Sequence, residues 1–213
     1  MDEDTLKQDV LENHLNETYV LENVKLNQIK RRLNEVSWND SVEKILKSLG
    51  EKASGNKSLH FHESQLWETK SNRSQMIIII LSTLCGMVTI ANTQFVIFRY
   101  IISVLNIGCA ILTSLSRFYK PDEKAQIHYN TSHNYGIMHR KLALEMSLSR
   151  IDRENADVLC DATRREYDRI QNQAPAVSNA TISWFETTVK KDINVSYPDV
   201  LNPTTIPIEI NVI

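Results

Sequence analysis

Polar residues recur at helical spacing inside a long apolar stretch of this chain. A guanidinium, a carboxamide and hydroxyls on one face of a helix can hydrogen-bond to a neighbouring helix or to water, but they are unfavourable against lipid. At ~100° per residue, six residues fall within about 40° of one line: Arg99, Ser103, Asn106, Ala110, Thr113 and Arg117.

The preceding apolar segment has a polar line of its own, and two interpretations of the pair are open. Small and hydroxyl residues let two helices approach closely, so the lines can be packing surfaces within a hairpin. The alternative is a water-lined or oligomer-contact face, since two helices do not easily bury two polar lines. The candidate pore-lining or oligomer-contact residues are Arg99, Ser103, Asn106, Thr113, Ser82, Gly86 and Thr89.

The other residues that could support chemistry lack the spacing for it. Ligand pairs on one helix face are three or four residues apart, whereas His128 and His133 are five apart and His133 and His139 are six apart. There is no Gly-rich phosphate loop and no convincing Ser/His/Asp set. The carboxylates Glu145 and Glu166 are isolated. We predict no enzyme activity, no cofactor and no metal site.

The apolar stretch runs from Ser74 to Ser116 and contains one charged residue, Arg99. One membrane-spanning helix needs about 20 apolar residues, so this stretch fits two. We predict spans at about residues 76–91 and 95–115, with the tight turn at Asn92-Thr93-Gln94. Two buried helices of a soluble protein can look the same, but a soluble core would need amphipathic partners to cover two helices that are apolar on every side.

Charges beside the two spans predict their orientation. Basic residues precede the first span and follow the second, so the positive-inside rule places both soluble arms on the cytosolic side. The flanking basic residues are Lys70, Arg73, Arg117, Lys120 and Lys124. Seven Asn-x-Ser/Thr sequons favour the opposite side; they begin at Asn16, Asn39, Asn56, Asn72, Asn130, Asn179 and Asn194. The net charge of -2 gives no indication of nucleic-acid binding.

The first arm begins with an amphipathic helical pattern over residues 1–36. Its apolar residues are three and four apart, with Glu22 interrupting the pattern once, which predicts either a coiled-coil assembly arm or a helix packed on its own chain. They are Leu11, Leu15, Tyr19, Leu26, Ile29, Leu33 and Val36. A break at Ser37-Trp38-Asn39-Asp40 follows, where Asn39 or Asp40 can cap the next helix. We expect Ser54-Gly55-Asn56 to weaken that helix, and we expect Trp67 to pack on protein.

After the second span the pattern predicts three more helices and a tail. A helix begins at Pro121, runs to about Ser149 and carries a semi-polar stripe for contact with the first arm. A second is expected from about Arg153 to Gln173, capped by Asp152 and ended by Pro175, and a third from Ser178 to Lys190. The semi-polar stripe contains Ala125, His128, Ser132, Tyr135, His139, Leu142 and Met146. The Pro-containing tail, residues 191–213, includes a strand-like segment, Ile208-Glu209-Ile210-Asn211-Val212.

These pieces, in this order, resemble the SMODS and SLOG-associating two-transmembrane effector domain family, in the form carried by many large DNA viruses. The similarity covers roughly residues 38–185. It rests on Trp38, 42–46 (VEKIL), 51–53 (EKA), 59–60 (LH), 80–86 (ILSTLCG), 106–108 (NIG), 110–113 (AILT), Ala125, His128, Glu145, 166–169 (EYDR) and 174–175 (AP).

The resemblance implies an all-helical, two-transmembrane effector-like domain over 38–190, gated in related systems by a nucleotide-sensing protein partner. We therefore expect a multi-pass membrane protein with the lipid bilayer and copies of itself as partners, which perturbs or permeabilises a membrane. A structural or scaffolding protein of a virion or internal membrane, without pore activity, is the alternative.

Overall fold

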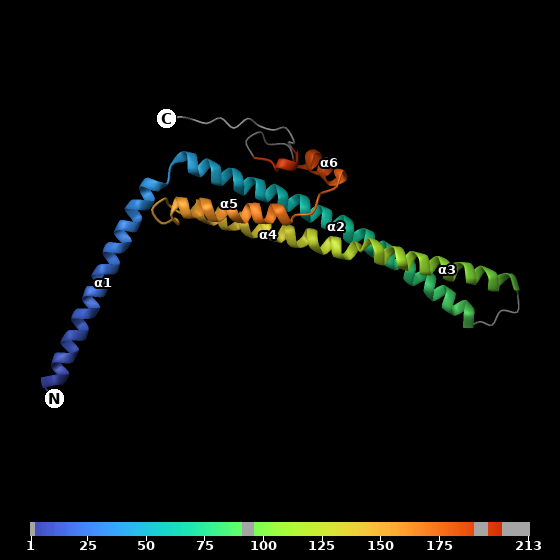
Figure 1. Ribbon diagram of the computed structural model, residues 1–213, viewed down its shortest axis with the longest axis horizontal. Helices are drawn as coiled ribbons and strands as arrows, with labels where there is room; N and C mark the ends of the chain where they lie inside the picture. The colour runs from blue at the N-terminus through green and yellow to red at the C-terminus, as the bar shows by residue number, and fades with distance from the viewer. Residues whose placement is uncertain (1–2, 91–95, 190–195, 202–213) are drawn as a thin grey trace. The chain divides into compact units, whose positions relative to one another are not determined.

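The computed structural model of this chain describes residues 3–90, 96–189 and 196–201, and every element in these ranges is helical (Figure 1). The helices are α1 (Glu3–Ser37), α2 (Asp40–Ile90), α3 (Val96–Tyr119), α4 (Pro121–Ser147), α5 (Ala156–Gln173) and α6 (Asn179–Thr188), followed by the short 3-10 helix η1 (Asp199–Leu201). The expected all-α class is confirmed, whereas the expected turn at 92–94 and the strand-like segment at 208–212 lie outside the described residues.

The break between α1 and α2 forms where the sequence predicts it. α1 ends at Ser37, and the Asn39 carboxamide accepts a hydrogen bond of 2.9 Å from the Val42 amide, which caps α2. Such a side-chain acceptor satisfies one of the amide groups that the first helical turn leaves without a backbone partner. Trp38 is buried at this break, and its indole nitrogen donates to the Glu154 carbonyl oxygen.

α2 continues through Ser54-Gly55-Asn56 without interruption, so the expected weakening there is wrong. A Cβ atom at Gly55 would lie 2.6 Å from Pro198, beside η1. The glycine is therefore needed for a close approach between α2 and the later segment, and it does not break the helix.

The contacts of the chain divide it into two compact units. The first contains residues 1–50 and 138–168, and the second contains residues 51–137 and 169–213. In the second unit, Leu59 of α2, Phe185 of α6 and Leu201 of η1 form a buried cluster. This core therefore forms against the part of α2 that comes before its apolar end.

The semi-polar stripe on α4 packs as the sequence predicts. In the second unit, His128 and Tyr135 are buried, and the Ser132 hydroxyl donates to the Lys57 carbonyl oxygen of α2. In the first unit, Leu142 is buried and a ring nitrogen of His139 lies 3.0 Å from the Gly50 carbonyl oxygen. The expected contact between α4 and the helix before the membrane segment is therefore confirmed.

The later helix boundaries agree with the prediction except at one cap. α4 begins at Pro121, and α6 is capped by Ser178. Asp152 does not cap α5; the Asn155 carboxamide accepts from the amides of Asp157 and Val158. The Asp152 carboxylate instead accepts from Ser149 and pairs with Arg31.

The described part of the apolar stripe on α1 is not covered by the chain. Tyr19 is 69% exposed and Val36 is 84% exposed, and the stripe residues between them are exposed as well. Leu11 and Leu15 lie where side chains are not described. For Tyr19 to Val36, packing of this stripe on its own chain is therefore wrong, and assembly with another helix stays a prediction.

Candidate membrane-spanning site

Among the described residues, α3 carries more exposed large apolar side chains than any other helix. Among the described residues, one helical stretch, Arg99–Ser147, is long and apolar enough to cross a membrane by length and composition, and 6% of its apolar window is buried. α3 has 24 residues and rises about 36 Å, more than the ~30 Å hydrocarbon core of a bilayer. Val104 is 68% exposed and Ile107 is 62% exposed.

The end of α2 supplies a second uncovered apolar surface beside α3 (Figure 1). Met76, Ile79 and Met87 are all exposed. From Met76 to Ile90 the helix rises about 22 Å, which is shorter than the ~30 Å hydrocarbon core. The rest of the first expected span, Ala91, and the start of the second, Phe95, lie outside the described residues, so a hairpin of two complete spans stays a prediction.

Two cysteines lie at the contact between α2 and α3. Cys85 and Cys109 are both buried, and their thiols interact with each other. Neither forms a disulfide. A Cβ atom at Gly86 would meet no other atom within 4 Å, so this glycine does not serve close approach of the two helices in the single chain.

The polar line on α3 lies largely on the surface of the chain. Arg99, Ser103 and Asn106 are exposed, and Thr113 is half-buried. The hydroxyls of Ser103 and Thr113 donate to carbonyl oxygens one turn earlier on α3, at 2.9 Å and 2.8 Å. The Asn106 carboxamide has no hydrogen-bond partner among the described residues.

The polar line on α2 is described in part. Ser82 is exposed, and its hydroxyl donates to the Ile79 carbonyl oxygen at 3.0 Å. Gly86 is exposed as well. The side chain of Thr89 lies outside the described part. The described residues of the two polar lines are therefore available for contact with water or with another chain.

A buried polar cluster outside the apolar stretch was missed by spacing arguments. His60 of α2 and His128 of α4 are both buried, and their Nδ1 atoms are 3.0 Å apart. At this distance one ring donates and the other accepts, which requires the accepting imidazole to be uncharged. Burial, and then the neighbouring His128, lower the pKa of His60 to about 4, while burial lowers the pKa of His128.

The same cluster contains the carboxylate of Glu63, which is 2% exposed. Burial acts to raise its pKa, but hydrogen bonds from Ser178 and Thr181 outweigh burial and lower the pKa below 4.5. His62 stacks on Trp184 with ring centroids 3.9 Å apart. The cluster joins α2, α4 and α6, and among the described residues no group of three or more His, Cys, Asp or Glu side chains could hold a metal ion.

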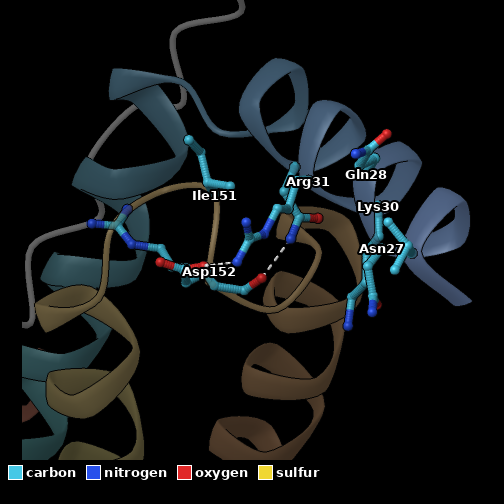
Figure 2. A pocket seen from close by; sticks show the side chains of 9 residues that line it. Asn27, Gln28, Lys30, Arg31, Ile151 and Asp152 are labelled. Atoms are coloured by element: carbon cyan, nitrogen blue, oxygen red, sulfur yellow. Dashed lines mark hydrogen bonds and ion pairs between the residues drawn. The ribbon is translucent and has the colours of Figure 1, made fainter. Parts of the chain in front are cut away.

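In the first unit, an open pocket of about 470 Å³ lies between α1 and the loop before α5 (Figure 2). Arg31 of α1 points to Asp152, with 3.5 Å between the charged atoms. Arg153 pairs with Glu43, and hydrogen bonds from Arg150 and Arg153 lower the pKa of Glu43 to about 2. The charges at this pocket are largely satisfied within the unit, which indicates a structural junction.

Comparison with family models, with curated proteins and with solved structures finds no match to this chain.

Proposed function

We propose that this chain is an integral membrane protein whose α2 end and α3 insert as a two-span hairpin, and that copies of it assemble and permeabilise the membrane. The observation that carries the proposal is the uncovered apolar surface of both segments. Leaving large apolar side chains in water is unfavourable by about 1.5 to 3 kcal/mol each, so this surface requires lipid or other protein around it.

The polar line on α3 supports assembly. Asn106 lies near the middle of the second proposed span and has no partner among the described residues. A carboxamide in hydrocarbon is unfavourable unless it is hydrogen-bonded. A neighbouring copy, or water held between copies, supplies the missing partner. The resemblance to two-transmembrane effectors agrees with this and adds a nucleotide-sensing protein as the trigger.

One observation favours the alternative, a scaffolding membrane protein without pore activity. The hydroxyls of Ser103 and Thr113 donate to their own helix, so they need neither water nor a second chain. In a scaffold without a water-lined pore, only Asn106 and Arg99 would therefore need a hydrogen-bond partner from outside their own helix. The two functions are separated by the behaviour of Asn106.

We expect Asn106→Leu to leave insertion intact and to weaken both oligomerisation and leakage of dye-loaded liposomes. The reason is that leucine is stable in lipid but cannot replace the hydrogen bonds of the carboxamide. The measurements are oligomer size in detergent and the leakage rate. Ile107→Leu, at an adjacent exposed apolar position, is the matched control and should behave like the wild type. Unchanged oligomer size and leakage in Asn106→Leu would favour the scaffold.

We also propose that both soluble arms lie on one side of the membrane, because basic residues flank the apolar segments at Lys70 and Lys120. In a Cys160→Ser background, Asn72→Cys and Gln126→Cys should have equal access to a membrane-impermeant maleimide in intact vesicles. Val96→Cys, near the turn, should have the opposite access. Different access at positions 72 and 126 would contradict the hairpin, and glycosylation of Asn130 would reverse its orientation.

A further inference from the structure

At the base of the apolar segments, an apolar cavity of about 280 Å³ lies between α2 and α3 in the second unit. Its wall is formed mainly by Trp67, Ile77, Ile78, Leu112, Leu115 and Tyr119. Ile77 and Leu112 belong to the two proposed spans, so the cavity is continuous with the surface that is proposed to contact lipid. At about 30 Å³ for each water-sized volume, the cavity has room for roughly nine such volumes. This size suits the upper part of one acyl chain.

Two lysines meet at the edge of this cavity. The Lys70 ammonium lies 4.4 Å from the centre of the Trp67 ring, and the Lys124 ammonium lies 4.6 Å from the same centre. The two positive charges are therefore no more than about 9 Å apart, since both lie close to one ring. Neither lysine forms an ion pair with a described residue.

An aromatic ring attracts these ammonium groups but does not neutralise them. Cation–π contact contributes roughly 0.5 to 1 kcal/mol at exposed sites. Of the nearby acidic side chains, Asp122 accepts a hydrogen bond from Gln75 and Glu123 pairs with Lys120, and neither forms an ion pair with Lys70 or Lys124. Two adjacent cations without a carboxylate make a site that suits an anion.

The position along the helices identifies the kind of anion. Lys70 precedes Met76 by about 9 Å of helix, which places its ammonium at the level of the headgroups if the hydrocarbon begins near Met76. Tryptophan, tyrosine and lysine are the residues typical of this level. Basic pockets beside transmembrane helices bind the headgroups of anionic lipids.

We propose that this cavity binds one anionic phospholipid, with its phosphate on Lys70 and Lys124 and part of an acyl chain against Trp67, Ile77 and Leu112. The inference rests on the membrane insertion proposed above. A soluble anion would use the lysines but would leave the apolar wall without a ligand, so a lipid fits both parts of the site. Trp67, which was expected to pack on protein, would then also contact lipid.

The test is native mass spectrometry of the full chain purified in detergent containing equal amounts of phosphatidylglycerol and phosphatidylcholine. We expect one retained phosphatidylglycerol per chain in preference to phosphatidylcholine. In the double variant Lys70→Gln/Lys124→Gln, we expect binding about 25-fold weaker, because each lysine near an anionic headgroup changes affinity by roughly five-fold. Lys70→Arg/Lys124→Arg should keep the lipid.

The matched control is Lys57→Gln/Lys141→Gln, which removes the same charge from two exposed positions and should bind as the wild type does. Helix content by circular dichroism verifies folding of each variant, and resistance to carbonate extraction measures insertion separately. Insertion with equal retention of both lipids, or full retention by the double variant, would overturn the lipid site and leave the proposed function standing. Displacement of the lipid by inorganic phosphate alone would identify a soluble-anion site instead. A wild-type chain that does not insert would overturn both proposals.

Discussion

Tyr135→Ala is expected to lower the free energy of unfolding by about 3 to 5 kcal/mol, the range for removing a fully buried aromatic side chain. The Tyr135 side chain on α4 is 0% exposed, and its ring stacks on the His60 ring of α2 with centroids 5.9 Å apart. Its hydroxyl donates a hydrogen bond of 2.8 Å to the Gln171 carboxamide of α5. The substitution therefore leaves a cavity where three helices meet.

Two further variants separate packing from polarity. Tyr135→Phe keeps the ring and removes one hydrogen bond, so we expect a loss of about 1 kcal/mol. Tyr129→Ala is the matched control on the same helix, because Tyr129 is 50% exposed and should change stability by no more than about 0.5 kcal/mol. Thermal or urea unfolding of the solubilised chain, followed by circular dichroism, measures all three. Equal effects of Tyr135→Ala and Tyr129→Ala would contradict burial of the α4 stripe.

The helix boundaries could be predicted from the sequence because local groups determine them. The Asn39 side chain caps α2, Pro121 begins α4, and α5 ends before Pro175. Each of these depends on a residue's own backbone or side chain and on its nearest neighbours. The cap of α5 could not be assigned in the same way. Asp152 and Asn155 are both good capping residues, and contacts with Arg31 and Ser149 occupy Asp152.

The buried polar cluster could not be predicted because it depends on pairing between distant helices. His60 and His128 are 68 positions apart, so spacing along one helix gives no information about their contact. Gly55 misled the prediction for a related reason. Its lack of a Cβ atom serves an approach by Pro198 that no local pattern reveals.

The apolar stretch was the clearest feature of the sequence, yet the sequence did not identify which faces of its helices meet. Composition predicted long apolar helices, and α3 agrees with that prediction. The buried contact residues are Cys85 and Cys109, which lie beside the polar lines and not on them. Two helices with several small residues offer several packing faces of similar quality, so periodicity alone does not select one.

Acidification from pH 7 to pH 4.5 is expected to lower the free energy of unfolding by about 2 to 3 kcal/mol. The loss arises at the buried contact between α2 and α4. Burial and His128 lower the pKa of His60 from 6.5 to about 4. Below pH 6.5 the unfolded chain therefore binds a proton that the folded chain does not bind, and stability falls with pH until the folded pKa is reached. The lowered pKa of His128 acts in the same direction.

The pH range is limited at 4.5 because the other shifted acidic groups titrate below it. Glu63 and Glu43 both have lowered pKa values, so both carboxylates bind protons less readily in the folded chain than in the unfolded chain, and any contribution from them has the same sign as that of the histidines. Urea unfolding at several pH values measures the slope. His60→Gln/His128→Gln should flatten the dependence, because neither glutamine titrates. His133→Gln, at an exposed position on α4, should keep the wild-type slope. The same slope in the double variant would show that the acid sensitivity arises from groups other than this buried pair.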